Sequence, residues 1–327
     1  MKVLVSYRGI PQSPGWATGD FVVKALRTLG HEVYPYAKYY QQNKWVEDRS
    51  LGSTGYRSLG LDDHEFDLIL YMECNDGDPQ YSELAVARAR KTACWLFDTS
   101  YYHDRCKSIV DYFRFDHVFL ANPLTIREYK VWGYKNVSCL RYGFDSEKHT
   151  RSSDTEKTIG VALVGSIRDD RKALAKALKD HGINLELISG KFREEYVDAL
   201  ASARIIVNQN PPEGRGLLNM RFFEAQAAGC YVLTEQEDYD ANHQEGTGMR
   251  YGALNGCYSS MSDLADQCRE ALGRRGLIRP EVSGLREAAS LYHWSLMVGD
   301  SYESRCQDLM HLLFPHETTT DYFSYKK

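Results

Sequence analysis

The sequence predicts an α/β protein made of two doubly wound parallel sheets that face a cleft. Short, continuous apolar runs, typical of strands buried on both faces of a parallel sheet, alternate with amphipathic helical stretches. This alternation runs along the chain twice, which indicates two sheets. The length of 327 residues agrees, because it fits two domains of roughly 150 residues better than one core.

The first run of alternation fills the N-terminal half of the chain. Apolar runs predict strands at residues 1–7, 32–35, 66–72, 92–98, 117–121 and 136–140. Helical periodicity or composition predicts helices at residues 21–31, 85–90 and 125–132. We take these elements as one domain, residues 1–150.

The second run begins after residues 150–157, a polar, aperiodic stretch that we interpret as a linker. Strands are predicted at residues 159–165, 185–188, 204–208 and 231–234, and helices at 170–180, 193–203, 220–228, 262–273 and 280–313. We therefore expect a second domain at residues 158–290. Residues 291–327 are expected to form a helix that packs back on the first domain, followed by a tail.

Charge and cysteine usage restrict the classes of function. A formal net charge of -5 argues against attraction of the whole protein to nucleic acid or anionic membranes, although a basic group (Lys38, Lys44, Arg49, Arg57) leaves a local patch open. The sequence has neither a secretion signal nor an apolar run of the ~18 residues that a membrane span needs. None of the eight cysteines lies in a C-x-x-C pair. We expect a cytoplasmic protein with free thiols and no metal site.

The strongest binding signal lies at residues 214–234. A glycine-bearing loop opens a helix, Gly229 ends it, and an apolar strand follows at once. The free N–H groups at a helix start favour an anion such as a diphosphate, and Arg221 can add a charge-assisted bond to phosphate. Glu224, one turn into the helix, could accept hydrogen bonds from ribose or sugar hydroxyls. A plain helix with a surface arginine and glutamate is the alternative.

This segment resembles the signature of glycosyltransferases of the GT-B class, which have two Rossmann-like domains. It is most similar to the group of the spore-maturation protein CgeB and related "glycosyl transferases group 1" proteins. That group carries an Arg, a Glu three residues later and a Gly five after that, which Arg221, Glu224 and Gly229 match, and Asn219 fits the pattern. The likeness extends through residues 116–122, 133–137 and 142–145, and covers roughly residues 90–300.

The resemblance implies a sugar transferase. Residues 1–150 would bind an acceptor, and residues 158–290 would bind a nucleotide-sugar, with a UDP-sugar as the expected donor. One departure bears on the chemistry: many retaining enzymes of the class carry a second Glu eight residues before the helix Glu, and that position is Gly216 here. Glu213 lies three residues too early, so retention or inversion at the anomeric carbon stays open.

Other donor contacts are expected at strand ends, where ligands bind in open parallel sheets. After the strand at 159–165, Gly165, Ser166 and Arg171 could hold the distal phosphate, with Arg168 as second choice; a solvated helix start is the alternative. Asn208 and Asn210 lie at and just after the end of the strand predicted at 204–208, where they could contact the donor. Phe192 or Tyr196 could stack on the nucleobase. The loop at residues 8–19 resembles the glycine loop that lies over the donor sugar in this class, which assigns Gly15, Thr18 and Gly19 to the sugar. Neither a G-x-x-x-x-G-K-[ST] phosphate loop nor a dinucleotide G-x-G-x-x-G is present.

The catalytic base is expected in the first domain. Asp98 ends a predicted strand and could deprotonate an acceptor hydroxyl or orient it, with His103 as the second candidate. Glu73 and Asp76 are weaker candidates for acceptor contacts, and an Asp98 that only caps a helix is the alternative. Because Asp76-Gly77-Asp78 lies in an acidic loop before Pro79, we expect no metal; arginines and helix amides would stabilise the leaving diphosphate instead.

Three other interpretations stay open from the sequence. The acceptor could be a small molecule, a polysaccharide or a modified DNA base, and a DNA-base (hydroxymethylpyrimidine) glycosyltransferase would need a basic groove and an extruded base. The protein could be a nucleotide-sugar epimerase on the same fold. It could also be a non-catalytic sugar-nucleotide-binding module, an alternative that the glycine at position 216 keeps open.

Overall fold

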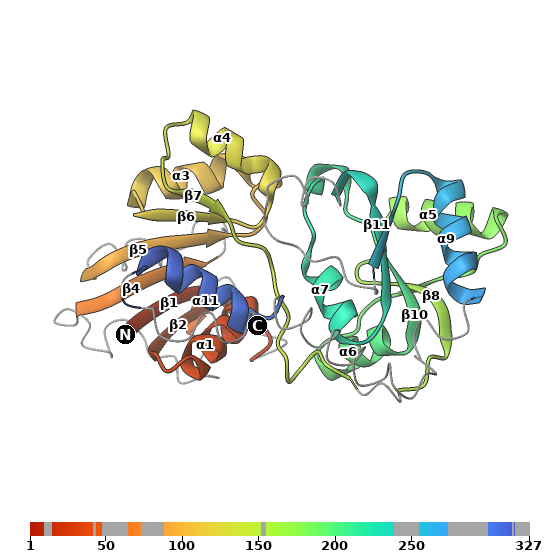
Figure 1. Ribbon diagram of the computed structural model, residues 1–327, viewed down its shortest axis with the longest axis horizontal. Coiled ribbons are helices and arrows are strands. Elements are labelled where there is room, and N and C mark those ends of the chain that lie inside the picture. The colour runs from red at the N-terminus through yellow and green to blue at the C-terminus, as the bar shows by residue number, and fades with distance from the viewer. Residues whose placement is uncertain are drawn as a thin grey trace. The chain divides into compact units, whose positions relative to one another are not determined.

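The computed structural model describes residues 1–9, 15–41, 44–47, 65–72, 88–151, 155–238, 255–273, 300–315 and 317. These residues divide into two compact units (Figure 1). Unit 1 comprises Met1–Arg141 and Tyr302–Lys327, and unit 2 comprises Tyr142–Ser301. The chain thus enters unit 2 ahead of the polar stretch 150–157, and returns to unit 1 at Tyr302.

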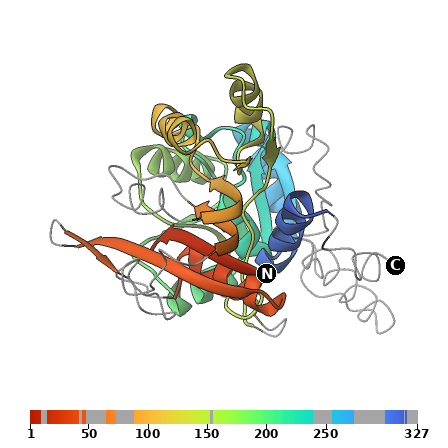
Figure 2. The same ribbon diagram turned by 90° about the vertical axis from the view of Figure 1, so that its left-hand side faces the viewer.

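Unit 1 is built on a seven-stranded sheet with the order β3-β2-β1-β4-β5-β6-β7. The pairs are parallel, except that β2 and β3 are antiparallel and form a hairpin at the edge, at the left of Figure 2. The strands are β1 (Lys2–Arg8), β2 (Glu32–Gln41), β3 (Lys44–Glu47), β4 (Glu65–Met72), β5 (Arg88–Leu96), β6 (His117–Leu120) and β7 (Val137–Cys139).

Helices cover both faces of this sheet. On one face, α1 (Thr18–Thr28) lies beside α11 (Tyr302–Leu313) (Figure 1). The ring of Tyr302 stacks on Phe21 of α1, with centroids 5.6 Å apart, and lies edge-on to Trp95 of β5. Burial of these large rings stabilises α11 on unit 1, since each removes extensive apolar surface from water.

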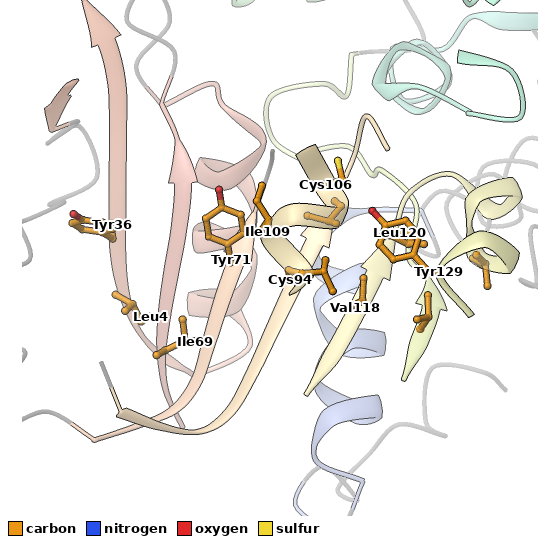
Figure 3. Close-up of a cluster of buried hydrophobic side chains, with 14 of the residues drawn as sticks. Leu4, Tyr36, Ile69, Tyr71, Cys94, Cys106, Ile109, Val118, Leu120 and Tyr129 are labelled. Carbon is orange, nitrogen blue, oxygen red and sulfur yellow. The ribbon is translucent and has the colours of Figure 1, made fainter. Parts of the chain in front are cut away.

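The other face is covered by α3 (His103–Phe113) and α4 (Ile126–Val131), which a short 3-10 turn (Pro123–Thr125) precedes. Their apolar side chains pack on strand residues in the cluster that Figure 3 draws. Ile109 of α3 and Tyr129 of α4 contribute to it from the helices, and Leu4, Cys94 and Val118 from the strands. Unit 1 is therefore the three-layer arrangement expected of a doubly wound sheet.

Unit 2 has a five-stranded parallel sheet with the order β12-β11-β10-β8-β9. Its elements are β8 (Ile159–Val164), α5 (Asp169–Asp180), β9 (Leu185–Ile188), α6 (Glu194–Ala201), β10 (Ala203–Asn208), a 3-10 turn (Pro212–Gly214), α7 (Met220–Ala227), β11 (Tyr231–Glu235), β12 (Asn255–Tyr258) and α9 (Met261–Gly273). Side chains of α5 and α9 share one hydrophobic cluster with the sheet. The strands β8, β10 and β11 are neighbours and parallel, so the loops after them meet at one edge.

Several expectations about elements were wrong. Residues 88–90, predicted to be helical, belong to β5, where Arg90 pairs with Asp67 of β4 at 3.0 Å. Helix α3 was not predicted, and α1 begins at Thr18, so Thr18 and Gly19 are helical residues and not loop residues. Glu73, Asp76 and all of residues 280–299 lie outside the described residues, as do the side chains of the basic group at 38–57.

Candidate active site

Gly165 lies where β8 ends, against two arginine side chains. Its φ of 140° is a conformation that favours glycine. A Cβ at this position would lie 2.7 Å from Nη2 of Arg221 and 3.2 Å from Nη1 of Arg171. The absence of a side chain thus lets two guanidinium groups approach the same point of the backbone, at the carboxyl end of a strand.

Arg171, on the first turn of α5, is buried and is held in place by backbone carbonyls. Its Nη1 donates to the carbonyl of Ser166 at 2.6 Å, and its Nη2 donates to the carbonyl of Gln209 at 3.1 Å. These bonds connect the loop after β8 to the loop after β10. The Ser166 side chain is exposed, and its hydroxyl lies 3.5 Å from Nη1.

Arg221 approaches from the first turn of α7. Its Nη1 donates to Oδ1 of Asn208 at 3.3 Å, and its buried Nε has no hydrogen-bond partner among the described residues. Burial lowers the pKa of Arg221, and the nearby Tyr196 and Glu224 offset this only in part. The Arg168 guanidinium lowers it further by repulsion, which a bound anion would relieve.

Amide side chains fill the strand-end loops. Asn208, the last residue of β10, is fully buried and donates to Oγ1 of Thr234 on β11 at 3.4 Å. Asn219 is the N-cap residue of α7 but makes no capping hydrogen bond with its side chain. It donates instead to Oδ1 of Asn210 at 2.6 Å. The start of α7 is therefore tied sideways to the loop after β10.

Glu224 is buried, and each of its carboxylate oxygens has a partner within unit 2. Tyr196 of α6 donates to Oε2 at 2.6 Å, and Nε2 of His149 lies 3.3 Å from Oε1. Because Nδ1 of His149 accepts the backbone N–H of Asp145, Nε2 is the ring nitrogen that faces the Glu224 carboxylate. The partner carboxylate and burial raise the pKa of Tyr196 well above its usual value, burial being the larger cause. Tyr196 thus contacts Glu224, and Phe192 stays 60% exposed.

The residues assigned to the donor-sugar loop lie around the start of α1. Gly15 has a φ of 75°, and residues 10–14 lie outside the described residues. Thr18 and Gly19 are buried in the first turn of α1, where a Cβ on Gly19 would lie 2.0 Å from Cγ of Tyr7. Gly19 therefore permits close packing of α1 on β1.

The two candidate bases lie at the end of β5 and at the start of α3. Asp98 follows β5 with an exposed side chain, and its backbone carbonyl accepts the N–H groups of Tyr101 and Tyr102. His103, the first residue of α3, has its Nε2 2.8 Å from Oε2 of Glu128 and its Nδ1 3.6 Å from Asp104. Sequence reasoning missed Glu128, because only the fold brings α4 beside α3.

Within the described part of the chain, no group of three or more His, Cys, Asp or Glu residues is arranged to hold a metal ion. The seven described cysteines are free thiols. None of the described helices is long and apolar enough to cross a membrane.

Comparison with known proteins relates this geometry to a family. Residues 158–282 match the family described as glycosyl transferase-like, and the search of curated proteins gives no match. Among solved structures, an alpha-glucosyltransferase in complex with UDP and a 13-mer DNA containing a HMU base has a TM-score of 0.65 at 11% identity, covering 96% of this chain and 99% of that one. Anabaena Alr3699/HepE in complex with UDP has a TM-score of 0.54 at 12% identity, covering 96% and 99%. WaaG, a glycosyltransferase involved in lipopolysaccharide biosynthesis, has a TM-score of 0.50 at 13% identity, covering 96% of this chain and 100% of that one.

The two parallel sheets have the fold of the similar GT-B glycosyltransferases. The segment that matches the glycosyl transferase-like family, residues 158–282, lies within unit 2. The segment contains both arginines beside Gly165 and all of α7, so the family match falls on the site described above. Membership of the CgeB group stays a prediction.

Proposed function

We propose that this protein transfers a sugar from a UDP-sugar to an acceptor hydroxyl, with Arg171 and Arg221 binding the donor diphosphate. The observation that best supports this proposal is the pair of guanidinium groups that converge on Gly165. The buried Nε of Arg221 has no hydrogen-bond partner among the described residues. Two adjacent cations, Arg171 buried and Arg221 half-buried, are costly alone and favourable around a diphosphate. The start of α7 adds the partial positive charge of a helix N-terminus.

The proposed reaction needs one proton acceptor and one stabilised leaving group. The acceptor oxygen forms a bond to the anomeric carbon of the sugar, while the bond from that carbon to the diphosphate oxygen breaks. Asp98 takes the hydroxyl proton, and UDP leaves with its negative charge compensated by Arg171 and Arg221. Asp98 is preferred to His103, because its exposed side chain follows the end of β5, and ligands bind at the carboxyl ends of strands in open parallel sheets.

Binding of UDP-glucose, taken as the probe from a panel of nucleotide-sugars, tests the phosphate site. We expect Arg221→Ala to weaken the affinity roughly 10- to 100-fold in calorimetric titration, because it removes charge-assisted bonds of about 1.5–3 kcal/mol. Arg204→Ala is the matched control, since it removes the same charge from an exposed position of β10 and should leave the affinity unchanged. An Arg221→Ala variant with unchanged affinity would refute the phosphate assignment.

Turnover separates the proposed transferase from the alternatives. A transferase hydrolyses the UDP-sugar slowly or forms a glycosylated product with a member of an acceptor panel. An epimerase converts the sugar without releasing UDP, and a binding module does neither. Absence of turnover of every nucleotide-sugar, with and without acceptors, would contradict the proposal.

A second candidate acceptor is a hydroxymethylated base in DNA. The similar alpha-glucosyltransferase was solved with a DNA containing a HMU base. In this chain, Tyr101 and Tyr102 are 37% and 41% exposed just after Asp98, and the Arg105 guanidinium lies 5.0 Å from the Tyr102 ring centroid. Exposed aromatic rings stack on bases as well as on sugars. Incorporation of labelled glucose into an oligonucleotide with one such base, and none into the unmodified oligonucleotide, would support this acceptor.

A further inference from the structure

Asp238, just after β11, is a fully buried carboxylate that the proposed chemistry does not use. Its Oδ1 accepts the backbone N–H of Gly216 at 2.6 Å, and its Oδ2 accepts Nδ2 of Asn210 at 3.0 Å. Both donors belong to the loop that joins β10 to α7. Because β10 and β11 are parallel neighbours, a carboxylate at the end of one strand reaches the loop that leaves the other.

This contact continues to the start of α7 through a chain of amides. Asn210, held by Asp238, accepts Nδ2 of Asn219 at 2.6 Å, and it also donates to the carbonyl of Leu217. Asn219 is the residue that caps α7, and Arg221 is on the first turn of that helix. Three side chains thus fix both the path of the loop and the place where α7 begins.

We propose that Asp238 is a positioning residue of the donor site, which holds the loop 210–219 and, through Asn210 and Asn219, places Arg221 against Gly165. This inference rests on the proposed role of Arg221 in binding the donor diphosphate. Asp238 itself need not touch the donor, because its two oxygens are occupied by the loop.

The backbone at position 216 agrees with this role. Gly216 has a φ of 78°, which favours glycine, and its N–H points to the Asp238 carboxylate. At this position many retaining enzymes of the GT-B class carry a glutamate. Here a carboxylate reaches the same point of the loop from the end of β11.

Burial of the Asp238 carboxylate carries a cost that its two hydrogen bonds reduce. Desolvation raises its pKa to about 6, and the Gly216 and Asn210 bonds oppose this rise. Among the described residues, the charged and titratable groups that act on it include Glu235 and Glu237 on its own segment and Tyr258 of β12; Arg215 pairs with Glu237 at 3.6 Å. A carboxylate kept at such a cost is typical of functional sites.

Protonation of Asp238 would weaken this link, because a carboxyl group presents a hydroxyl where the carboxylate accepted a bond. The loop should therefore be held firmly at pH values above 6 and less firmly at pH values below 6. UDP-glucose is a suitable probe, since the ionisation near pH 6 belongs to terminal phosphate groups and its diphosphate has none. A change of affinity between pH 5 and 8 then reports on the protein.

The test measures the UDP-glucose affinity of the full chain from pH 5 to 8 for the wild type, Asp238→Asn and Glu237→Gln. The wild type should bind roughly tenfold more weakly at pH 5 than at pH 7.5, with a midpoint near 6. Asp238→Asn sets an amide against the Asn210 amide, so it should bind about tenfold more weakly at pH 7.5 and show no such midpoint. Glu237→Gln removes a like charge at an exposed neighbouring position, so it should keep the wild-type affinity at pH 7.5 and a midpoint that moves only slightly below that of the wild type.

A second variant guards against an Asp238→Asn protein that does not fold. Asn219→Ala leaves Asp238 untouched and removes only the last amide, so it too should lose affinity and the pH midpoint. Wild-type affinity and midpoint in either folded variant would overturn the positioning role. A wild type that does not bind UDP-glucose or any other nucleotide-sugar would instead refute the proposed function, so the two failures are distinguishable.

Discussion

At the scale of single residues, Asp98 and His103 lie five positions apart and offer different chemistry. The exposed Asp98 side chain follows a strand end, whereas His103 lies between Glu128 and Asp104. Asp98→Asn should lower the transfer rate about 10²- to 10⁴-fold, the usual contribution of a positioned base, without changing the affinity for UDP-glucose. His103→Gln should lower the rate less than about tenfold. Single-turnover assays check both, and the reverse ranking would make His103 the base.

The Glu224 contacts show what a motif cannot predict. The spacing of Arg221, Glu224 and Gly229 in the sequence indicated the donor helix, and α7 has the predicted place after the glycine-bearing loop. The same spacing does not show that Tyr196 and His149 occupy both oxygens of Glu224, because those residues come from other segments. Direct contact of Glu224 with ribose therefore stays a prediction that requires a change of these partners.

At the scale of elements, the end of β8 is the feature most sensitive to change. Gly165→Ala adds a Cβ 2.7 Å from Nη2 of Arg221, at a φ of 140°. We expect it to weaken UDP-glucose binding at least tenfold, because the guanidinium must move away. Gly160→Ala is the matched control on the same strand, since its Cβ would meet Leu272 at an ordinary 3.6 Å. Equal affinities in the two variants, measured by calorimetry, would contradict the role of Gly165.

The strands of buried parallel sheets were the easiest elements to predict, because their continuous apolar runs reflect burial on both faces. Helix α3 was missed although Cys106, Ile109, Val110 and Phe113 recur with helical spacing. The start of β5 could not be predicted in this way, since Arg88–Lys91 is polar. Pairing with β4 and the ion pair of Arg90 with Asp67 override its local preference.

At the scale of the whole molecule, Asp238 should affect stability in the direction opposite to binding. Its pKa of about 6 in the folded protein exceeds the ordinary 3.8, so the folded state holds more protons between these values. The contribution of Asp238 to the free energy of unfolding is therefore fully present below about pH 4 and is lost as the pH rises through 6. From pH 5 to 7.5, the stability of Asp238→Asn relative to wild type should rise by about 1 kcal/mol. Urea denaturation at both pH values measures this difference, and a constant difference would contradict it.

Unit 1 is assembled from both ends of the described chain, and unit 2 lies between them in sequence. The segments at which the chain enters and leaves unit 2 lie side by side. Phe144 and Ser301 form a backbone bridge, and the N–H of Phe144 donates to the carbonyl of Asp300. During synthesis, every described strand of unit 2 leaves the ribosome before α11 does. The seven-stranded sheet must therefore wait, with Phe21 and Trp95 uncovered, until Tyr302 arrives. Vectorial folding of this chain thus completes the inserted unit first and closes the enclosing one last.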